Sequence, residues 1–178
     1  TVKFIRFPKL LWQDLAHPVV GSVLPTLAMG WMVVSHSLGQ WNSAAGQALW
    51  LAAVTLHLLF LCCFIYHRTQ NFQLHQMVPS WFVPFVGISV AAMTVPNPQY
   101  YSLAYGLMVF GMLSYTALLP IMLYRLIFAK ELDDASKPTI AILAAPASLS
   151  LVAYLSLETS PSLLLCSMLL GVDRKSVV

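Results

Sequence analysis

Charged residues are scarce in this chain: Asp, Glu, Lys and Arg make up only 8% of its 178 residues. A soluble domain has about 25% charged residues and about 45–50% apolar ones. Here 59% of the residues are hydrophobic and the mean hydropathy is +0.78, which is more apolar surface than a chain of this length buries on folding. The composition excludes a soluble enzyme, a disordered linker and a nucleic-acid-binding module, and it indicates a protein that folds in a lipid bilayer.

Motifs for metal binding and catalysis are lacking as well. The three cysteines, Cys62, Cys63 and Cys166, lie in apolar runs, where a thiol keeps its proton and is inert. The five histidines show no metal-ligand spacing, and no Ser/His/Asp set is grouped in the sequence. We therefore expect no metal, no cofactor and no catalytic residue.

Five apolar runs are long enough to cross a membrane: 18–37, 44–66, 79–96, 101–124 and 138–157. None contains Asp, Glu, Lys or Arg. As α-helices they reach roughly 27–36 Å, enough for a hydrocarbon core of about 30 Å. They are continuous rather than alternating in polarity, which is typical of helices and not of barrel strands. The sequence predicts an all-α, polytopic membrane protein.

The two ends suggest an internal fragment of a longer chain. A sixth apolar run begins at Pro161 and stops after 12 residues, which is too short to cross a membrane. Residues 173–178, Asp-Arg-Lys-Ser-Val-Val, can be translated from common sequencing-adapter DNA, and we interpret them as a scar. We expect residues 1–172 to form part of one transmembrane domain.

Among the connectors, Lys and Arg fall only in alternate ones. Seven lie in segments 1–17, 67–78 and 125–137, and none lies in 38–43, 97–100 or 158–160. Positively charged connectors stay on the cytoplasmic side of a membrane. The amino end of the chain is therefore predicted to be cytoplasmic.

Prolines mark a repeat of about 60 residues. The runs that start at residues 18, 79 and 138 each open with proline and are spaced 61 and 59 residues apart. A second proline lies inside each of these runs: Pro25, Pro84 and Pro146. An internal proline kinks a helix, and irregular backbone in a membrane is tolerated only against protein or a water-filled cavity. The pattern predicts helical hairpins around a central pore.

The two kinds of run differ in composition. The proline-containing runs are rich in small residues such as Gly87, whereas the second and fourth runs are rich in Leu and Phe. Small residues let helices approach closely. We interpret the first, third and fifth runs as an inner ring and the others as an outer, lipid-facing ring.

The pore predicted in this way favours anions. A cation pathway or proton pump usually shows carboxylates or a charged relay in the membrane, and these runs contain no carboxylate. Broken helices present N–H groups and positive dipole ends. Lys9, His17, Arg68 and Lys137 lie near the cytoplasmic mouth, where the basic residues would concentrate anions. The absence of a tight charged site favours passive conduction.

His57 stands near the centre of the second run and allows two interpretations. An ionisable group inside a membrane can be a proton relay or a substrate contact. A neutral imidazole can also simply form a hydrogen bond between helices.

Three stretches carry a resemblance to a known family. They are His17-Pro18-Val19 with Pro25 behind it, Pro84-Phe85-Val86-Gly87 followed by Ala91-Ala92, and Lys137-Pro138-Thr139 with Ala144-Ala145-Pro146. In this order and spacing they resemble the tellurite-resistance/C4-dicarboxylate transporter family, which includes the slow-type anion channels of plant guard cells.

The resemblance implies ten helices in five hairpins, with the odd helices lining a pore and this chain supplying helices three to seven and part of eight. It implies transport of chloride, nitrate or dicarboxylates such as malate, a link to tellurite resistance, a trimeric assembly and a bacterial inner-membrane location. It also places Phe85 as a pore phenylalanine, beside Pro25, Pro84, Gly87 and Pro146 on the pore side. The alternative for Phe85 is ordinary packing of an aromatic ring in a membrane helix. Small anions, lipid and further copies of the chain are the expected partners, without nucleic acid.

Two other functions remain open at this point. One is a proton-coupled dicarboxylate carrier, for which a buried carboxylate in the remaining helices would argue. The other is a membrane anchor or interaction subunit that conducts nothing.

Overall fold

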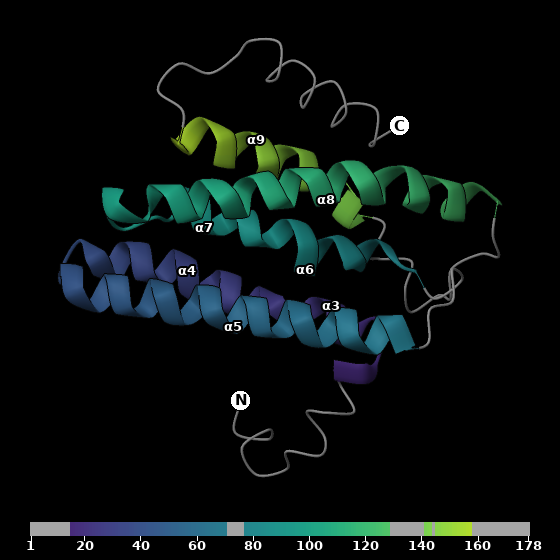
Figure 1. The fold of residues 1–178 in the computed structure, drawn as a ribbon, viewed down its shortest axis with the longest axis horizontal. Helices are drawn as coiled ribbons and strands as arrows, with labels where there is room; N and C mark the ends of the chain where they lie inside the picture. The colour runs from purple at the N-terminus through teal and green to yellow at the C-terminus, as the bar shows by residue number, and fades with distance from the viewer. Residues whose placement is uncertain (1–14, 71–76, 129–140, 144, 158–178) are drawn as a thin grey trace.

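The computed structural model describes residues 15–70, 77–128, 141–143 and 145–157. In these ranges the regular elements are all helices, joined by short turns, and there is no strand. The long helices lie side by side along the longest axis of the molecule (Figure 1). The predicted all-α fold is therefore confirmed.

The first hairpin pairs a broken helix with a continuous one. The first run divides at Leu24 into α3 (Val20–Val23) and α4 (Pro25–Gly39), with proline as the first residue of α4. A tight turn then leads into α5 (Ser43–Gln70). Pro25 cannot donate a backbone hydrogen bond to the preceding turn, so the chain is divided where the sequence predicts a kink.

The third run is divided into four pieces. They are η2 (Pro79–Trp81), α6 (Phe82–Val86), η3 (Gly87–Ser89) and α7 (Val90–Met93). The two η segments are 3₁₀ turns, which wind more tightly than an α-helix and often mark strained or functional positions. Every residue from Val86 to Ala92 is buried.

The second hairpin begins with η4 (Pro98–Tyr100), which Asn97 caps by accepting a hydrogen bond from the Gln99 N–H at 3.1 Å. It continues as α8 (Tyr101–Phe128), an unbroken helix although it contains Pro120. The last described helix is α9 (Ala145–Leu157).

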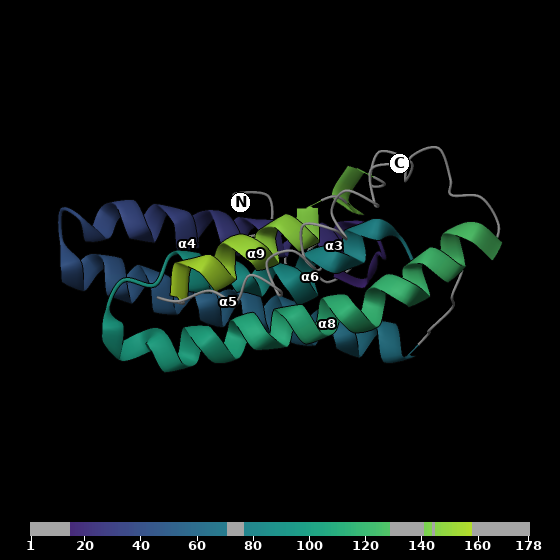
Figure 2. The same cartoon turned by 90° about the horizontal axis from the view of Figure 1, so that it is seen from above.

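The helices α4, α6–α7 and α9 form a continuous row. The α6–α7 segment packs against α4 on one side and α9 on the other, while α5 contacts α6 and α8 contacts α6, α7 and α9. Figure 1 shows the α4–α5 hairpin below α6–α7, with α8 and α9 above it, and Figure 2 shows the same helices from above. The breaks predicted near Pro25 and Pro84 thus lie in adjacent segments, with α5 and α8 packed against them. Their place in an inner ring around a pore stays a prediction.

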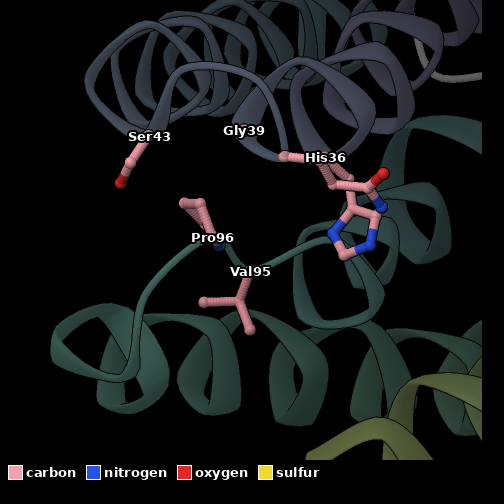
Figure 3. A pocket seen from close by; sticks show the side chains of 6 residues that line it. His36, Gly39, Ser43, Val95 and Pro96 are labelled. Atoms are coloured by element: carbon pink, nitrogen blue, oxygen red, sulfur yellow. The ribbon is translucent and has the colours of Figure 1, made fainter.

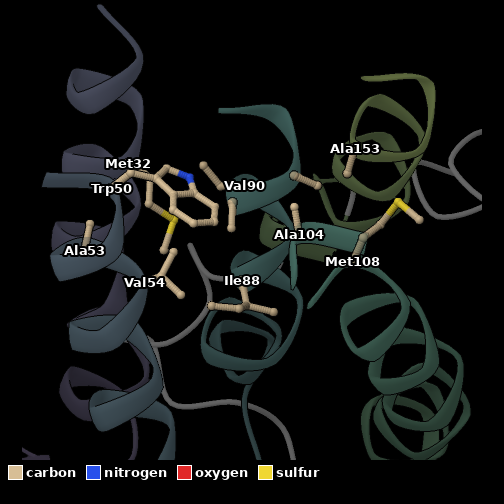
Figure 4. Packing of buried hydrophobic residues seen from close by; sticks show 11 residues of the cluster. Met32, Trp50, Ala53, Val54, Ile88, Val90, Ala104, Met108 and Ala153 are labelled. Atoms are coloured by element: carbon tan, nitrogen blue, oxygen red, sulfur yellow. The ribbon is translucent and has the colours of Figure 1, made fainter. Parts of the chain in front are cut away.

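Two apolar clusters hold the row together. Figure 4 shows the first, in which Ile88 lies among Met32, Trp50, Val54 and other buried side chains. The second gathers large side chains nearer the other end of the helices: Phe64, Trp81, Phe82, Tyr115 and Met122. Side chains of α5, α8 and the broken segment meet in both clusters, so α6–α7 is the centre of the packing.

The surface of the long helices is apolar. Leu59 on α5 and Leu113 and Ile127 on α8 are 57%, 66% and 69% exposed. The stretches Ser43–Gln70 and Pro98–Phe128 are long and apolar enough to cross a membrane. Large exposed side chains of this kind are stable against lipid rather than water.

Both long helices extend beyond the predicted runs. The sequence interpretation ends these runs at residues 66 and 124, whereas α5 ends at Gln70 and α8 ends at Phe128. Arg68 and Arg125 therefore lie in the last helical turns, and Arg125 is only 3% exposed. Basic side chains near a helix C-terminus interact favourably with its dipole.

Candidate functional site: the breaks in the inner helices

The break after α3 is linked to the start of the next inner helix. The Ser22 hydroxyl donates to the Val19 carbonyl at 2.7 Å and lies 2.6 Å from the Ser80 hydroxyl. Because the single Ser22 proton goes to Val19, Ser80 is the donor between the two serines. Both serines are fully buried, and Pro25 is buried beside them on α4.

The second break depends on the absence of a side chain at Gly87. A Cβ there would lie 2.7 Å from Met29 Sδ and 3.4 Å from His57 Cε1. Gly87 therefore lets a side chain from α4 and one from α5 reach the backbone of the broken segment. Pro84 is buried three residues earlier.

His57 forms a hydrogen bond to the broken helix. Its Nε2 lies 3.0 Å from the Pro84 carbonyl oxygen, and the side chain is fully buried. A carbonyl oxygen only accepts hydrogen bonds, so Nε2 carries the proton. This geometry agrees with the interpretation of His57 as an imidazole hydrogen-bonded between helices.

Phe85 packs against the outer helix α5. Its half-buried ring lies 6.1 Å from the ring of Phe64, at an interplanar angle of 81°. Phe64 also makes an edge contact with Trp81, at 5.3 Å. Edge-to-face pairs of this kind stabilise aromatic clusters. The described residues bring Phe85 into this cluster, and its role in a pore stays a prediction.

Pro146 lies in the first turn of α9 and is buried with Ala147. The four other predicted pore residues, Pro25, Pro84, Phe85 and Gly87, belong to the adjacent elements of the same row. The structure thus places the five residues on neighbouring inner helices, and their lining of a pore stays a prediction.

Two of the four predicted mouth residues come together at one end of the bundle. The Nδ1 atom of His17 accepts from the N–H groups of Val19 and Val20 at 3.3 Å each and so caps α3. The Arg68 guanidinium donates to the Ala16 carbonyl and lies 6.0 Å from the centre of the Phe64 ring. Lys9 and Lys137 lie outside the described residues, as do the truncated run from Pro161 and the interpreted scar.

A small depression lies at the opposite end. It encloses about 170 Å³ between the α4–α5 turn and the segment after α7 (Figure 3). His36, Gly39, Gln40, Ser43, Val95 and Pro96 line it. Across the described residues, no group of three His, Cys, Asp or Glu side chains is placed to hold a metal ion.

Several close contacts were not anticipated from the sequence. A Cβ on Gly46 would lie 2.5 Å from Gly39 Cα, and a Cβ on Gly111 would overlap Ser89 Oγ. The serine pair was also missed, although Ser22 and Ser80 are 58 residues apart, close to the repeat length. That spacing is a signal that could have indicated the pair.

Broken, uncharged segments packed between long apolar helices are those of a helical membrane protein. Residues 1–172 match the SLAC1 family, described as voltage-dependent anion channel, and the chain belongs to this family. It is an integral membrane protein of a family of channels and transporters rather than enzymes.

Two curated relatives are transporters of the archaeon Methanocaldococcus jannaschii. The chain is 27% identical over 170 residues to the uncharacterized transporter MJ0762 and 28% identical over 171 residues to the uncharacterized transporter MJ0576. Each match covers 88% of this chain, and 50% and 49% of the two relatives. The chain therefore spans about half the length of the curated relatives it matches.

Proposed function

We propose that the protein passes small anions across a membrane by passive conduction, with chloride, nitrate and C4-dicarboxylates such as malate as the substrate class. The observation that carries the proposal is the row formed by α4, the broken α6–α7 segment and α9, whose sequences contain no Asp, Glu, Lys or Arg. Membership of an anion-channel family supports it.

The physical argument concerns backbone groups. Each break leaves N–H and C=O groups without regular helical partners, and the N-terminal ends of the half-helices attract negative charge. An uncharged wall holds an anion weakly, which favours throughput over trapping. Pro25, Pro84, Phe85, Gly87 and Pro146 would line this wall once the remaining helices close the ring.

The mouth and the assembly complete the proposal. Lys9, His17, Arg68 and Lys137 would surround the cytoplasmic entrance, where basic groups raise the local anion concentration. The amino end of the chain would face the cytoplasm of a bacterium, across its inner membrane. The whole protein would hold ten helices per pore and three pores per assembly, and its activity would bear on tellurite resistance.

The test is anion efflux from proteoliposomes that contain the full-length protein. Chloride, nitrate and malate are loaded separately, and efflux is measured over a range of membrane potentials without a proton gradient. Potential-driven efflux of at least one anion supports the proposal. Efflux that requires a proton gradient and stops with a protonophore would instead indicate a coupled carrier. Buried His57 would then be the first candidate for a proton relay. No efflux at any potential would indicate an anchor.

A further inference from the structure

The break between α6 and η3 has an unusual hydrogen-bond arrangement. In a regular α-helix the Pro84 carbonyl would accept from the N–H four residues later. The Gly87 N–H still pairs with the Val83 carbonyl as in an α-helix. The Val90 N–H instead pairs with the carbonyls of Gly87 and Ile88, which are only three and two residues earlier. The winding changes directly after the Pro84 carbonyl, and the donor that meets this oxygen from outside the helix is the imidazole of His57 at 3.0 Å.

The surrounding residues make room for this contact. Gly87 lacks the Cβ that would stand 3.4 Å from His57 Cε1 and 2.7 Å from Met29 Sδ. Both Gly87 and His57 are buried. A larger residue at position 87 would push the imidazole or Met29 away from the broken segment.

A second contact holds α6, and it comes from a residue of α5 that lies two turns beyond His57. The Phe64 ring, seven residues after His57, meets the ring of Phe85, the residue that follows Pro84. The straight helix α5 thus contacts α6 through one hydrogen bond and one aromatic pair. Two contacts fix a short helix in both position and rotation, which a single one does not.

We propose that His57 is a positioning residue, whose Nε2–H holds the Pro84 carbonyl and so sets the angle at which the second inner helix, the α6–α7 segment, breaks. Without this donor, the α-helical winding of α6 would continue into η3, or α6 would turn away from α5. Either change would rotate Phe85 and the backbone groups after it. The effect on conduction rests on the proposed function, whereas the effect on helix geometry does not.

The first experiment measures the tautomer of His57 in the unmodified full-length protein. Nitrogen NMR of histidine-labelled protein should show a neutral ring with its proton on Nε2, and the signal is assigned by its loss in His57→Gln. A proton on Nδ1 would overturn the proposal, and this result needs no destabilised variant.

The second experiment measures the exposure of α6 by thiol labelling of Val83→Cys, in the full-length protein with every native cysteine, Cys62, Cys63 and Cys166 among them, changed to Ala. His57→Leu removes the donor, and the labelling rate should rise by about fivefold as the segment opens more often. His57→Gln keeps an N–H donor and should restore the slow rate. Thr55→Leu, on the exposed face of α5, is the matched control and should have no effect.

Equal labelling rates for His57→Leu and the unmodified protein would refute the positioning role. If His57→Leu does not fold, the comparison of His57→Gln with the shorter His57→Asn decides, since the proposal expects slow labelling only for Gln. In the efflux assay the chloride-to-nitrate ratio should change in His57→Leu and return in His57→Gln. Absence of efflux from the unmodified protein would defeat the proposed function, while the tautomer and labelling results would still decide the role of His57.

Discussion

The outer helix α8 and the inner segment α6–α7 respond differently to proline. Pro120 lies inside α8, yet this helix runs unbroken for 28 residues. Pro84 lies in a segment that is divided into four short pieces. Near Pro120 the neighbours are mostly bulky and apolar, whereas Pro84 is followed by Gly87 and Ser89, which have lower helix propensity.

The packing around the two prolines differs too. Pro120 is exposed, whereas the Pro84 carbonyl contacts the buried imidazole of His57. The missing Cβ of Gly87 also leaves space for one side chain from α4 and one from α5. Proline alone therefore does not determine a break in this fold. At Pro84 the break coincides with weak helix formers beside the proline and with a tertiary donor, His57, for the Pro84 carbonyl itself.

The largest effect is expected where two helices touch through glycine. In Gly46→Ala the new Cβ would lie 2.5 Å from Gly39 Cα and 3.0 Å from the Ser35 carbonyl oxygen. These are backbone atoms that cannot turn away, so the α4–α5 hairpin must separate, at a cost of about 3 kcal/mol in unfolding free energy. Denaturant unfolding of the full-length protein in detergent measures this. Gly106→Ala, with no atom within 4 Å, is the control and should lose nothing.

A smaller loss is expected where α8 touches the broken segment. In Gly111→Ala the new Cβ would overlap the Ser89 hydroxyl, and the unfolding free energy should fall by about 2 kcal/mol. The obstacle is a side-chain atom, so Ser89→Ala in the same protein should recover most of the loss. Equal instability of the single and double variants would show that the contact is not the cause.

Conduction should distinguish the inner row from the outer helices. Phe85→Ala removes the ring predicted to narrow the pore, and basal anion current should rise by about fivefold, or roughly 1 kcal/mol of barrier. Phe110→Ala removes an exposed ring from α8 and should leave the current unchanged. Patch recording of the full-length protein measures both, and an unchanged current in Phe85→Ala would assign this ring to packing with Phe64 alone.

The proline comparison itself can be tested. Pro120→Ala restores an N–H donor for the preceding turn of α8, and it should raise the unfolding free energy by about 1 kcal/mol, part of the cost of proline inside a helix. Pro84→Ala should give no such gain, because its segment is broken by other residues as well. Thermal unfolding of both variants in the same detergent measures the difference, and equal shifts would contradict the distinction.

The smallest effect concerns the link between repeats. Ser22→Ala removes the hydrogen bond to Ser80 at 2.6 Å, and such bonds in membrane proteins contribute about 0.6 kcal/mol on average. A double-mutant cycle with Ser80→Ala isolates this energy. Strictly additive losses would show that the two hydroxyl groups do not stabilise each other.

Part of this structure was predictable because it follows from local chemistry. The helical runs and the breaks near Pro25 and Pro84 follow from apolar length and from the missing proline donor. The predicted runs ended at residues 66 and 124 because Arg68 and Arg125 suggested connectors. The helices in fact continue to Gln70 and Phe128. Charge alone does not end a helix, since arginine is favourable in a last turn.

The sequence by itself determined that this chain enters a membrane, crosses it as helices and alternates broken with continuous ones, because hydropathy and proline act on segments of a few turns. Only the tertiary structure decided that His57 meets the Pro84 carbonyl and that Ser22 meets Ser80, 27 and 58 residues away along the chain. The rotation of each helix about its axis decides such pairs, and that rotation is set by how neighbouring helices fill the space between them.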